Sequence, residues 1–243
     1  MARVFETALV IILFTGLVVA QNPWDQIWQK ATKQSSSTLS TDKIAAGLTE
    51  ALKVSTSRAV ASTGRPDGFL KNEAIKILLP DKLRKAGTTL RLVGMGPQLD
   101  ELEVGMNRAA EQATPKAKQI FLNALSQMTI ADARQILKGG DTAATEYFKS
   151  KSSSALTEAF APIVHDSLQN VGVVQQYDAV LRNPIAAGVV RSQKFDLDQY
   201  VVGKTLDGLF YTLGQEEKKI RTNPAAQTTT LLKEVFGKTD VRR

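Results

Sequence analysis

The stretch from Leu99 to Phe148 constrains the fold most, because it reads as three consecutive helices separated by recognisable stops. Apolar residues recur in it at three- and four-residue spacing, which predicts amphipathic helices that pack against one another. Short breaks divide the three parts, at Thr114-Pro115, Met128-Thr129 and Gly139-Gly140-Asp141. A run of short helices with such breaks favours an all-α domain.

The breaks carry local chemistry that predicts helix ends. The Thr-Pro pair at 114–115 is suited to begin the second helix, with the threonine as its N-cap. Thr129, followed three residues later by Asp132, resembles a capping box. We expect Gly139-Gly140 to end the third helix in the left-handed conformation, and Asp141 to cap the long helix that follows.

The rest of the chain continues the helical pattern. The spacing predicts further helices over 42–61, 81–92, 142–170, 173–181, 197–213 with a continuation to 221, and from 223 onward. Residues 75–80 are expected to be extended, the one place for a strand-like piece, and residues 185–195 to form a loop. The fold class that follows is all-α, a single compact irregular bundle of about eight to ten helices.

The N-terminal residues read as an export signal. Arg3 precedes an apolar run from Ala8 to Ala20 that ends in small residues, so we expect a secretory signal over 1–20, cleaved before Gln21. An uncleaved anchor is the weaker alternative, because a membrane span needs about 20 apolar residues. The expected order is then a flexible polar lead over 21–39, the helical domain over 40–238 and a tail over 239–243. The location would be the periplasm or the extracellular space.

Composition narrows the chemistry. The chain has no cysteine and one histidine, so it offers no disulfide, no thiolate metal site and no histidine-rich metal site. We predict no cofactor and no metal. The net charge of +7 is spread over the sequence and lacks interleaved aromatics, so we expect no nucleic-acid partner. Weak contact with an anionic membrane surface, through the basic residues and Trp24 with Trp28, remains open.

Six polar residues are the candidate ligand-binding set. They combine a polar row at four-residue spacing on one helix, a turn at residues 65–69 and the expected helix cap: Arg65, Asp67, Glu103, Asn107, Glu111 and Asp141. A pocket would lie where these three elements converge. The alternatives are a solvated or inter-helix hydrogen-bonded row and a plain cap. No catalytic residue is predicted, and His165 is expected to be a packed or surface histidine.

Several segments resemble one known family. They are Gly64–Phe69, Met106–Glu111, Gly139–Phe148, Leu206–Phe210, Glu216-Glu217 and Asn223–Ala226. Together they resemble the family called domain of unknown function 4197, over roughly residues 40–238. The resemblance implies an exported helical protein, in a family often preceded by a signal or a lipoprotein leader. It implies no activity, ligand or catalytic residue.

Three functions follow as hypotheses. The leading one is an exported module that binds a protein partner or small ligand in the cell envelope or outside the cell. The first alternative is a carboxylate-based hydrolase, which needs two acids in one cleft and a raised carboxyl pKa. The second is association with a membrane surface. Whether the protein is an enzyme, and its oligomeric state, stay open from sequence.

Overall fold

The computed structural model describes residues 41–170, 172–184, 196–227 and 233. The chain divides into two units, Met1–Leu39 and Ser40–Arg243, and the described residues all belong to the second. The expected signal, polar lead, Trp24 and Trp28, the loop at 185–195, most of the helix after Pro224 and the tail lie outside the described residues.

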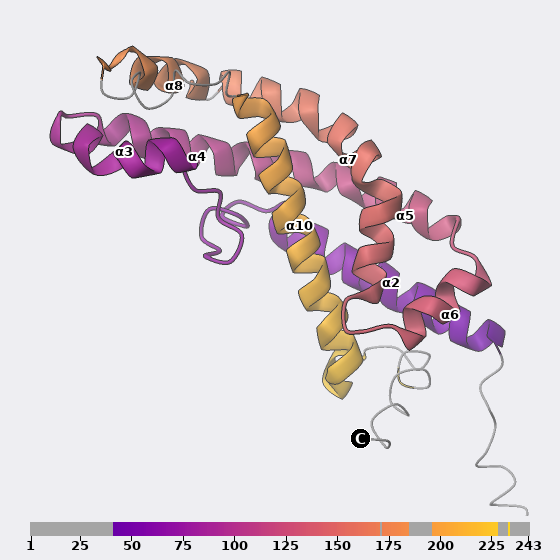
Figure 1. Cartoon of the computed structure of the whole chain (residues 1–243). Coiled ribbons are helices and arrows are strands. Elements are labelled where there is room, and N and C mark those ends of the chain that lie inside the picture. The colour runs from indigo at the N-terminus through magenta and orange to yellow at the C-terminus, as the bar shows by residue number, and fades with distance from the viewer. Residues whose placement is uncertain (1–40, 171, 185–195, 228–232, 234–243) are drawn as a thin grey trace, which may run out of the picture. The chain divides into compact units, whose positions relative to one another are not determined.

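Within these ranges the chain is helical and contains no strand (Figure 1). The helices are α2 (Thr41–Thr63), α3 (Asp81–Leu92), α4 (Gly96–Ala113), α5 (Ala117–Ser126), α6 (Ile130–Lys138), α7 (Ala143–Asn170), α8 (Val173–Arg182) and α10 (Leu197–Thr222), with short 3-10 turns at Thr114–Lys116 and Pro224–Ala226. The expected all-α class is confirmed. The expected eight to ten helices refer to the whole domain, part of which is not described.

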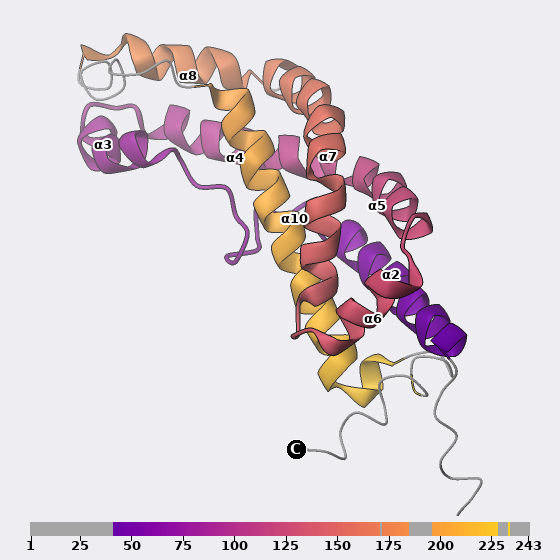
Figure 2. The same cartoon turned by 45° about the vertical axis from the view of Figure 1, so that its right-hand side comes forward.

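Helix α10 is central to the described unit. It contacts α7, α2 and α4, while α3 packs on the beginning of α4 and α8 runs along α4 (Figures 1 and 2). Three phenylalanines from α5, α7 and α10 meet in the core, with the Phe121 ring centroid 5.2 Å from that of Phe148 and 6.0 Å from that of Phe210. Edge-on aromatic pairs of this kind add to the area that they bury.

The predicted apolar stripe of α4 is confirmed. Its six members are completely buried: Leu99, Leu102, Met106, Ala109, Ala110 and Ala113. Helix α4 contacts α7 and α8 along its length. No helix among the described residues is long and apolar enough to cross a bilayer.

Local capping was predicted in part. The Thr129–Asp132 capping box is present, with both reciprocal hydrogen bonds formed. The N-cap prediction for Thr114 is wrong, because its backbone is already helical and its hydroxyl donates to Ala110 O at 2.8 Å. The chain therefore passes from α4 to α5 through a continuous 3-10 turn rather than a restart.

Helix α6 ends at Gly139 as predicted, but the predicted left-handed conformation is wrong. The φ of −77° and ψ of 178° at this glycine are extended rather than left-handed. Glycine is required there by close packing, since a Cβ would lie 2.5 Å from the Cβ of Ala143. Gly172, by contrast, is left-handed, with φ of 72°, and separates α7 from α8.

Candidate functional site

The row of polar side chains on α4 holds the segment between α2 and α3, residues 64–80. Glu111, almost fully buried, accepts hydrogen bonds from the backbone N–H groups of Phe69 at 3.0 Å and Leu70 at 3.1 Å. Asn107 accepts from Ile77 N at 2.8 Å and donates to Ile77 O at 2.8 Å. The expected extended piece therefore pairs with a side-chain amide instead of a strand, and both backbone polar groups of the buried Ile77 are satisfied.

Charge pairing completes this contact. Arg108 donates to Glu111 Oε2 at 2.7 Å and to Asp67 Oδ1 at 2.7 Å, and Lys71 also pairs with Asp67 at 2.8 Å. The hydrogen bonds from Lys71 and Arg108 lower the pKa of Asp67. We call Asp67, Asn107, Arg108 and Glu111 the loop clamp. Each member forms hydrogen bonds or ion pairs with other groups of the protein.

Two further features press the segment against the helices. Phe69 is fully buried, and a Cβ on Gly208 of α10 would lie 2.5 Å from its ring. Asp67 adopts a φ of 65°, uncommon for a residue with a side chain. Such a conformation persists where the surroundings over-determine it, and here the two ion pairs of Asp67 and the buried Phe69 do so.

Five of the six predicted site residues lie along this segment and α4. Besides the clamp members, Glu103 pairs with Lys76 at 2.8 Å, which raises the pKa of Lys76, and Arg65 is exposed on the turn. Two open hollows flank the turn, of about 310 Å³ beside Pro115 and about 480 Å³ beside Asn72. Clamp residues line both.

Asp141 does not join them. It is exposed and lies 4.0 Å from Lys218, whereas Phe69 of the turn contacts Gly208 on the same helix. Ten residues of α-helix span about 15 Å, more than one helix diameter. The predicted convergence of three elements at one pocket is therefore wrong for Asp141. Ligand binding by the other five residues stays a prediction.

Glu217 takes the capping role that was expected of Asp141. Its carboxylate accepts from Ala144 N and Thr145 N, each at 2.9 Å, and from the Thr145 hydroxyl at 2.8 Å. Arg221 pairs with the same carboxylate at 2.9 Å and donates to Ile136 O at 2.9 Å. A carboxylate at a helix N-terminus complements the exposed N–H groups and the helix dipole. This contact fixes where α7 begins relative to α6.

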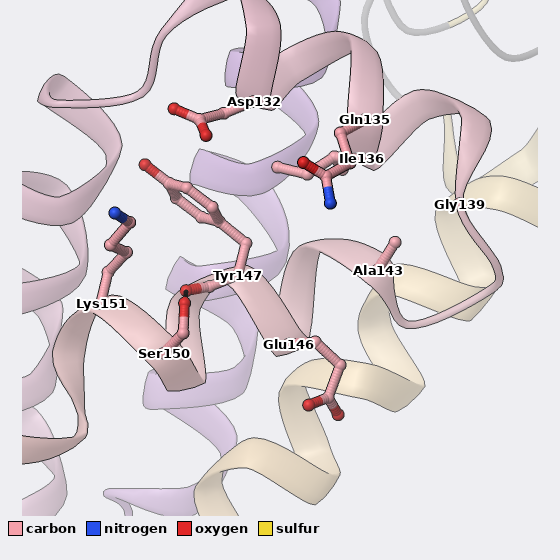
Figure 3. Close-up of a pocket in the computed structure, with 9 residues that line it drawn as sticks. All are labelled: Asp132, Gln135, Ile136, Gly139, Ala143, Glu146, Tyr147, Ser150 and Lys151. Carbon is pink, nitrogen blue, oxygen red and sulfur yellow. Dashed lines mark hydrogen bonds between the residues drawn. The ribbon is translucent and has the colours of Figure 1, made fainter.

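That placement leaves a hollow between α6 and the first two turns of α7 (Figure 3). Its volume is about 440 Å³, and we call it the α6–α7 hollow. Nine residues line it: Asp132, Gln135, Ile136, Gly139, Ala143, Glu146, Tyr147, Ser150 and Lys151.

Polar groups gather on the two sides of this hollow. In Figure 3 the carboxylate of Asp132, the hydroxyl of Tyr147 and the amino group of Lys151 point toward one another, and Glu146 lies at the opposite end. Partial burial, and to a smaller extent the Asp132 charge, raises the pKa of Tyr147. The capping box engages only Oδ2 of Asp132, and the Tyr147 hydroxyl makes one long hydrogen bond, at 3.4 Å to Ala124 O.

Sequence reasoning missed this hollow. A signal was present, since Ala143, Glu146, Tyr147 and Ser150 follow the three- and four-residue spacing of a single helix face. For the facing residues on α6, the sequence predicted only that Asp132 caps the helix and that Ile136 belongs to its apolar face. Their meeting depends on the Glu217 contact, 72 and 73 residues away from its partners in sequence.

The comparisons with known proteins place the chain in a family. A family model described as protein of unknown function (DUF4197) matches residues 38–237. The chain is a member of the DUF4197 family. The predicted resemblance is thus confirmed, and both the loop clamp and the α6–α7 hollow of this DUF4197 protein lie within the matched residues. No curated protein and no solved structure is significantly similar to the chain.

Neither region of the DUF4197 protein offers a metal centre. Among the described residues no group of three or more histidine, aspartate or glutamate side chains could hold a metal ion. The single histidine, His165, lies on the surface, where Nδ1 is 2.6 Å from Asp198 Oδ2. The polar chemistry that these regions present is therefore that of carboxylate, ammonium, amide and phenol groups.

Proposed function

We propose that this DUF4197 protein is a binding module whose α6–α7 hollow takes a small polar ligand that carries an amine or several hydroxyl groups. One observation carries the proposal: the hollow gathers polar side chains that make few contacts within the fold. Within the described ranges, Gln135 and Glu146 form no side-chain hydrogen bond or ion pair, and Lys151 Nζ lies over the Tyr147 ring, 6.0 Å from its centroid. Binding sites typically place a few such groups around an apolar floor.

The lining suggests the ligand class. The lining includes two carboxylates and one ammonium group, so the hollow favours hydrogen-bond donors and a positive charge. The side chain of Ile136 and the ring of Tyr147 supply apolar surface for the body of the ligand. A volume of about 440 Å³ suits a molecule of the size of an amino sugar or a short amine.

We further propose that the module works in the periplasm or outside the cell. The support is the N-terminal sequence, where Arg3 precedes the apolar run from Ala8 to Ala20.

The carboxylate-hydrolase alternative has less support. A general acid that works near neutral pH needs a raised pKa, but the pKa values of Asp67, Asp100 and Asp132 are all lowered by hydrogen-bond partners. The buried carboxylates Glu111 and Glu217 already bind backbone N–H groups and arginine.

Saturation-transfer NMR with glucosamine, ethanolamine and putrescine as probes tests the proposal. We expect at least one probe to receive saturation from the wild type. Gln135→Trp, which fills the hollow, and Glu146→Gln, which removes a carboxylate, should abolish or weaken that transfer. Glu158→Gln on the same helix is the control and should bind as the wild type does. Absence of transfer for all three probes, or equal transfer in every variant, would refute the proposed site.

A further inference from the structure

The turn between α3 and α4 exposes two adjacent apolar side chains. Leu92, the last residue of α3, is 83% exposed, and Val93 after it is 50% exposed. Gly94 follows in the left-handed conformation, with φ of 87°, and carries the chain into α4. Adjacent large apolar side chains at the end of a hairpin form a protruding tip rather than part of a groove. A tip of this kind costs solubility unless it contacts something apolar.

Basic residues lead along α3 to this tip. Lys82, Lys85, Thr89 and Leu92 are three or four residues apart, so they lie along one side of the helix. All four are exposed, while Leu83, Ala86, Gly87 and Leu90 are buried on the other side. Helix α3 carries four basic residues and one acidic residue, Asp81.

The two neighbouring arginines each pair with an aspartate. Arg84 pairs with Asp81 at 2.7 Å, and Arg91 makes two hydrogen bonds to Asp100. These pairs neutralise one side of the helix. Lys85 has no acidic partner among the residues that the structure describes, so it contributes an uncompensated positive charge on the side that ends at Leu92.

We propose that the tip formed by Leu92 and Val93, together with Lys82 and Lys85, docks the protein on an anionic membrane surface. The apolar side chains would enter the interfacial region, and the lysines would remain at the level of the phosphate groups. Charge complementarity selects this occupant: an apolar tip alone would also suit a protein, but a lysine stripe leading to it matches a negatively charged lipid surface. The docking is peripheral, and it does not involve the residues that line the α6–α7 hollow.

A site-specific probe tests this docking. Because the chain has no cysteine, Leu92→Cys can be labelled with the environment-sensitive fluorophore NBD at a single position. Ile130→Cys, at an exposed apolar residue of α6, is the matched control within the same full chain. With vesicles of phosphatidylglycerol and phosphatidylcholine in equal parts, we expect a several-fold rise and a blue shift for the probe at position 92 and little change at position 130.

Charge variants provide the second arm. Each basic residue near an anionic surface contributes roughly fivefold in affinity, so Lys82→Gln with Lys85→Gln should weaken vesicle binding roughly twenty-five-fold. Lys116→Gln with Lys118→Gln removes the same charge at two exposed lysines elsewhere and should have a much smaller effect. Binding should also fall between about 20 mM and about 500 mM salt.

Three results would overturn the docking. The first is an unchanged signal at position 92 with anionic vesicles. The second is an equal change at positions 92 and 130, which would place the contact elsewhere, for example in the apolar N-terminal run. The third is a blue-shifted signal at position 92 without vesicles that grows with protein concentration, which would identify a second copy of the chain as the occupant.

Discussion

The loop clamp and the α6–α7 hollow contain similar polar groups but use them differently. In the clamp, Glu111 and Asn107 are buried and bind the backbone of residues 69, 70 and 77. In the hollow, Glu146 and Lys151 are exposed; within the described residues Glu146 forms no side-chain hydrogen bond or ion pair, and Lys151 lies over the Tyr147 ring. A polar row at helical spacing is therefore not evidence for a site by itself. What matters is whether its atoms are already engaged within the protein.

Glu217 supports the same lesson from a second place. Like Glu111, it is a buried glutamate that accepts two backbone N–H bonds and pairs with an arginine on its own helix. The two contacts position different features, a loop in one case and a helix N-terminus in the other. Both contacts hold a neighbouring segment in place. The α6–α7 hollow results from the placement of α7 by Glu217.

The largest expected effect comes from removing the clamp carboxylate. Glu111→Ala leaves the N–H groups of Phe69 and Leu70 without an acceptor and Arg108 without its main partner, so we expect a loss of about 3 kcal/mol in the free energy of unfolding. Urea denaturation followed by circular dichroism measures it. Glu101→Ala, exposed on the same helix, should change the stability by less than about 0.5 kcal/mol. Equal effects would remove the distinction between the two regions.

The amide of the clamp should come next. Asn107→Ala leaves both polar groups of the buried Ile77 backbone unpaired, and we expect a loss of about 2 kcal/mol. The same denaturation experiment applies. Hydrogen exchange at Ile77 should also become faster in the variant, and unchanged exchange there would contradict the assigned role of Asn107.

Packing under the loop gives a smaller effect of defined sign. A Cβ on Gly208 would overlap the ring of Phe69 at 2.5 Å, whereas one on Gly203 of the same helix would meet nothing within 4 Å. Gly208→Ala should cost about 1 kcal/mol net, and Gly203→Ala should stabilise by about 0.5 kcal/mol through helix propensity. Thermal unfolding of both variants should therefore shift in opposite directions. Shifts of the same sign would show that the loop is not pressed against α10.

The smallest effect is expected for the exposed ion pair of His165 and Asp198. Comparison with the buried Glu111 of the loop clamp shows how much burial adds to the stability that a charged pair contributes. The hydrogen bond to Asp198 raises the pKa of His165 above 6.5. The pair therefore stabilises the fold fully below pH 6.5, and this contribution is lost as the pH rises through the folded-state pKa. NMR titration of the single imidazole should give a pKa above 6.5 in the wild type and a lower one in Asp198→Asn. An identical pKa in both proteins would exclude the pair.

The sequence predicted what depends on neighbours in the chain. The apolar stripe of α4 and the Thr129–Asp132 box rest on contacts three and four residues apart, and both are present. The prediction that Asp141 caps α7 is wrong because Glu217, more than 70 residues away, binds the N–H groups at the helix N-terminus. The polar row of α4 was identified, but its partners lie 30 to 42 residues away and could not be read from local spacing.

Native-state hydrogen exchange in two matched variants tests the central claim most directly. Glu111→Gln and Glu146→Gln each remove one negative charge with little change in shape, the first in the loop clamp and the second in the α6–α7 hollow. The account predicts that exchange at the amides of Phe69 and Leu70 becomes at least tenfold faster in Glu111→Gln, corresponding to about 1.4 kcal/mol. It predicts wild-type exchange throughout the chain in Glu146→Gln. Wild-type protection in Glu111→Gln, or a comparable loss of protection in Glu146→Gln, would contradict it.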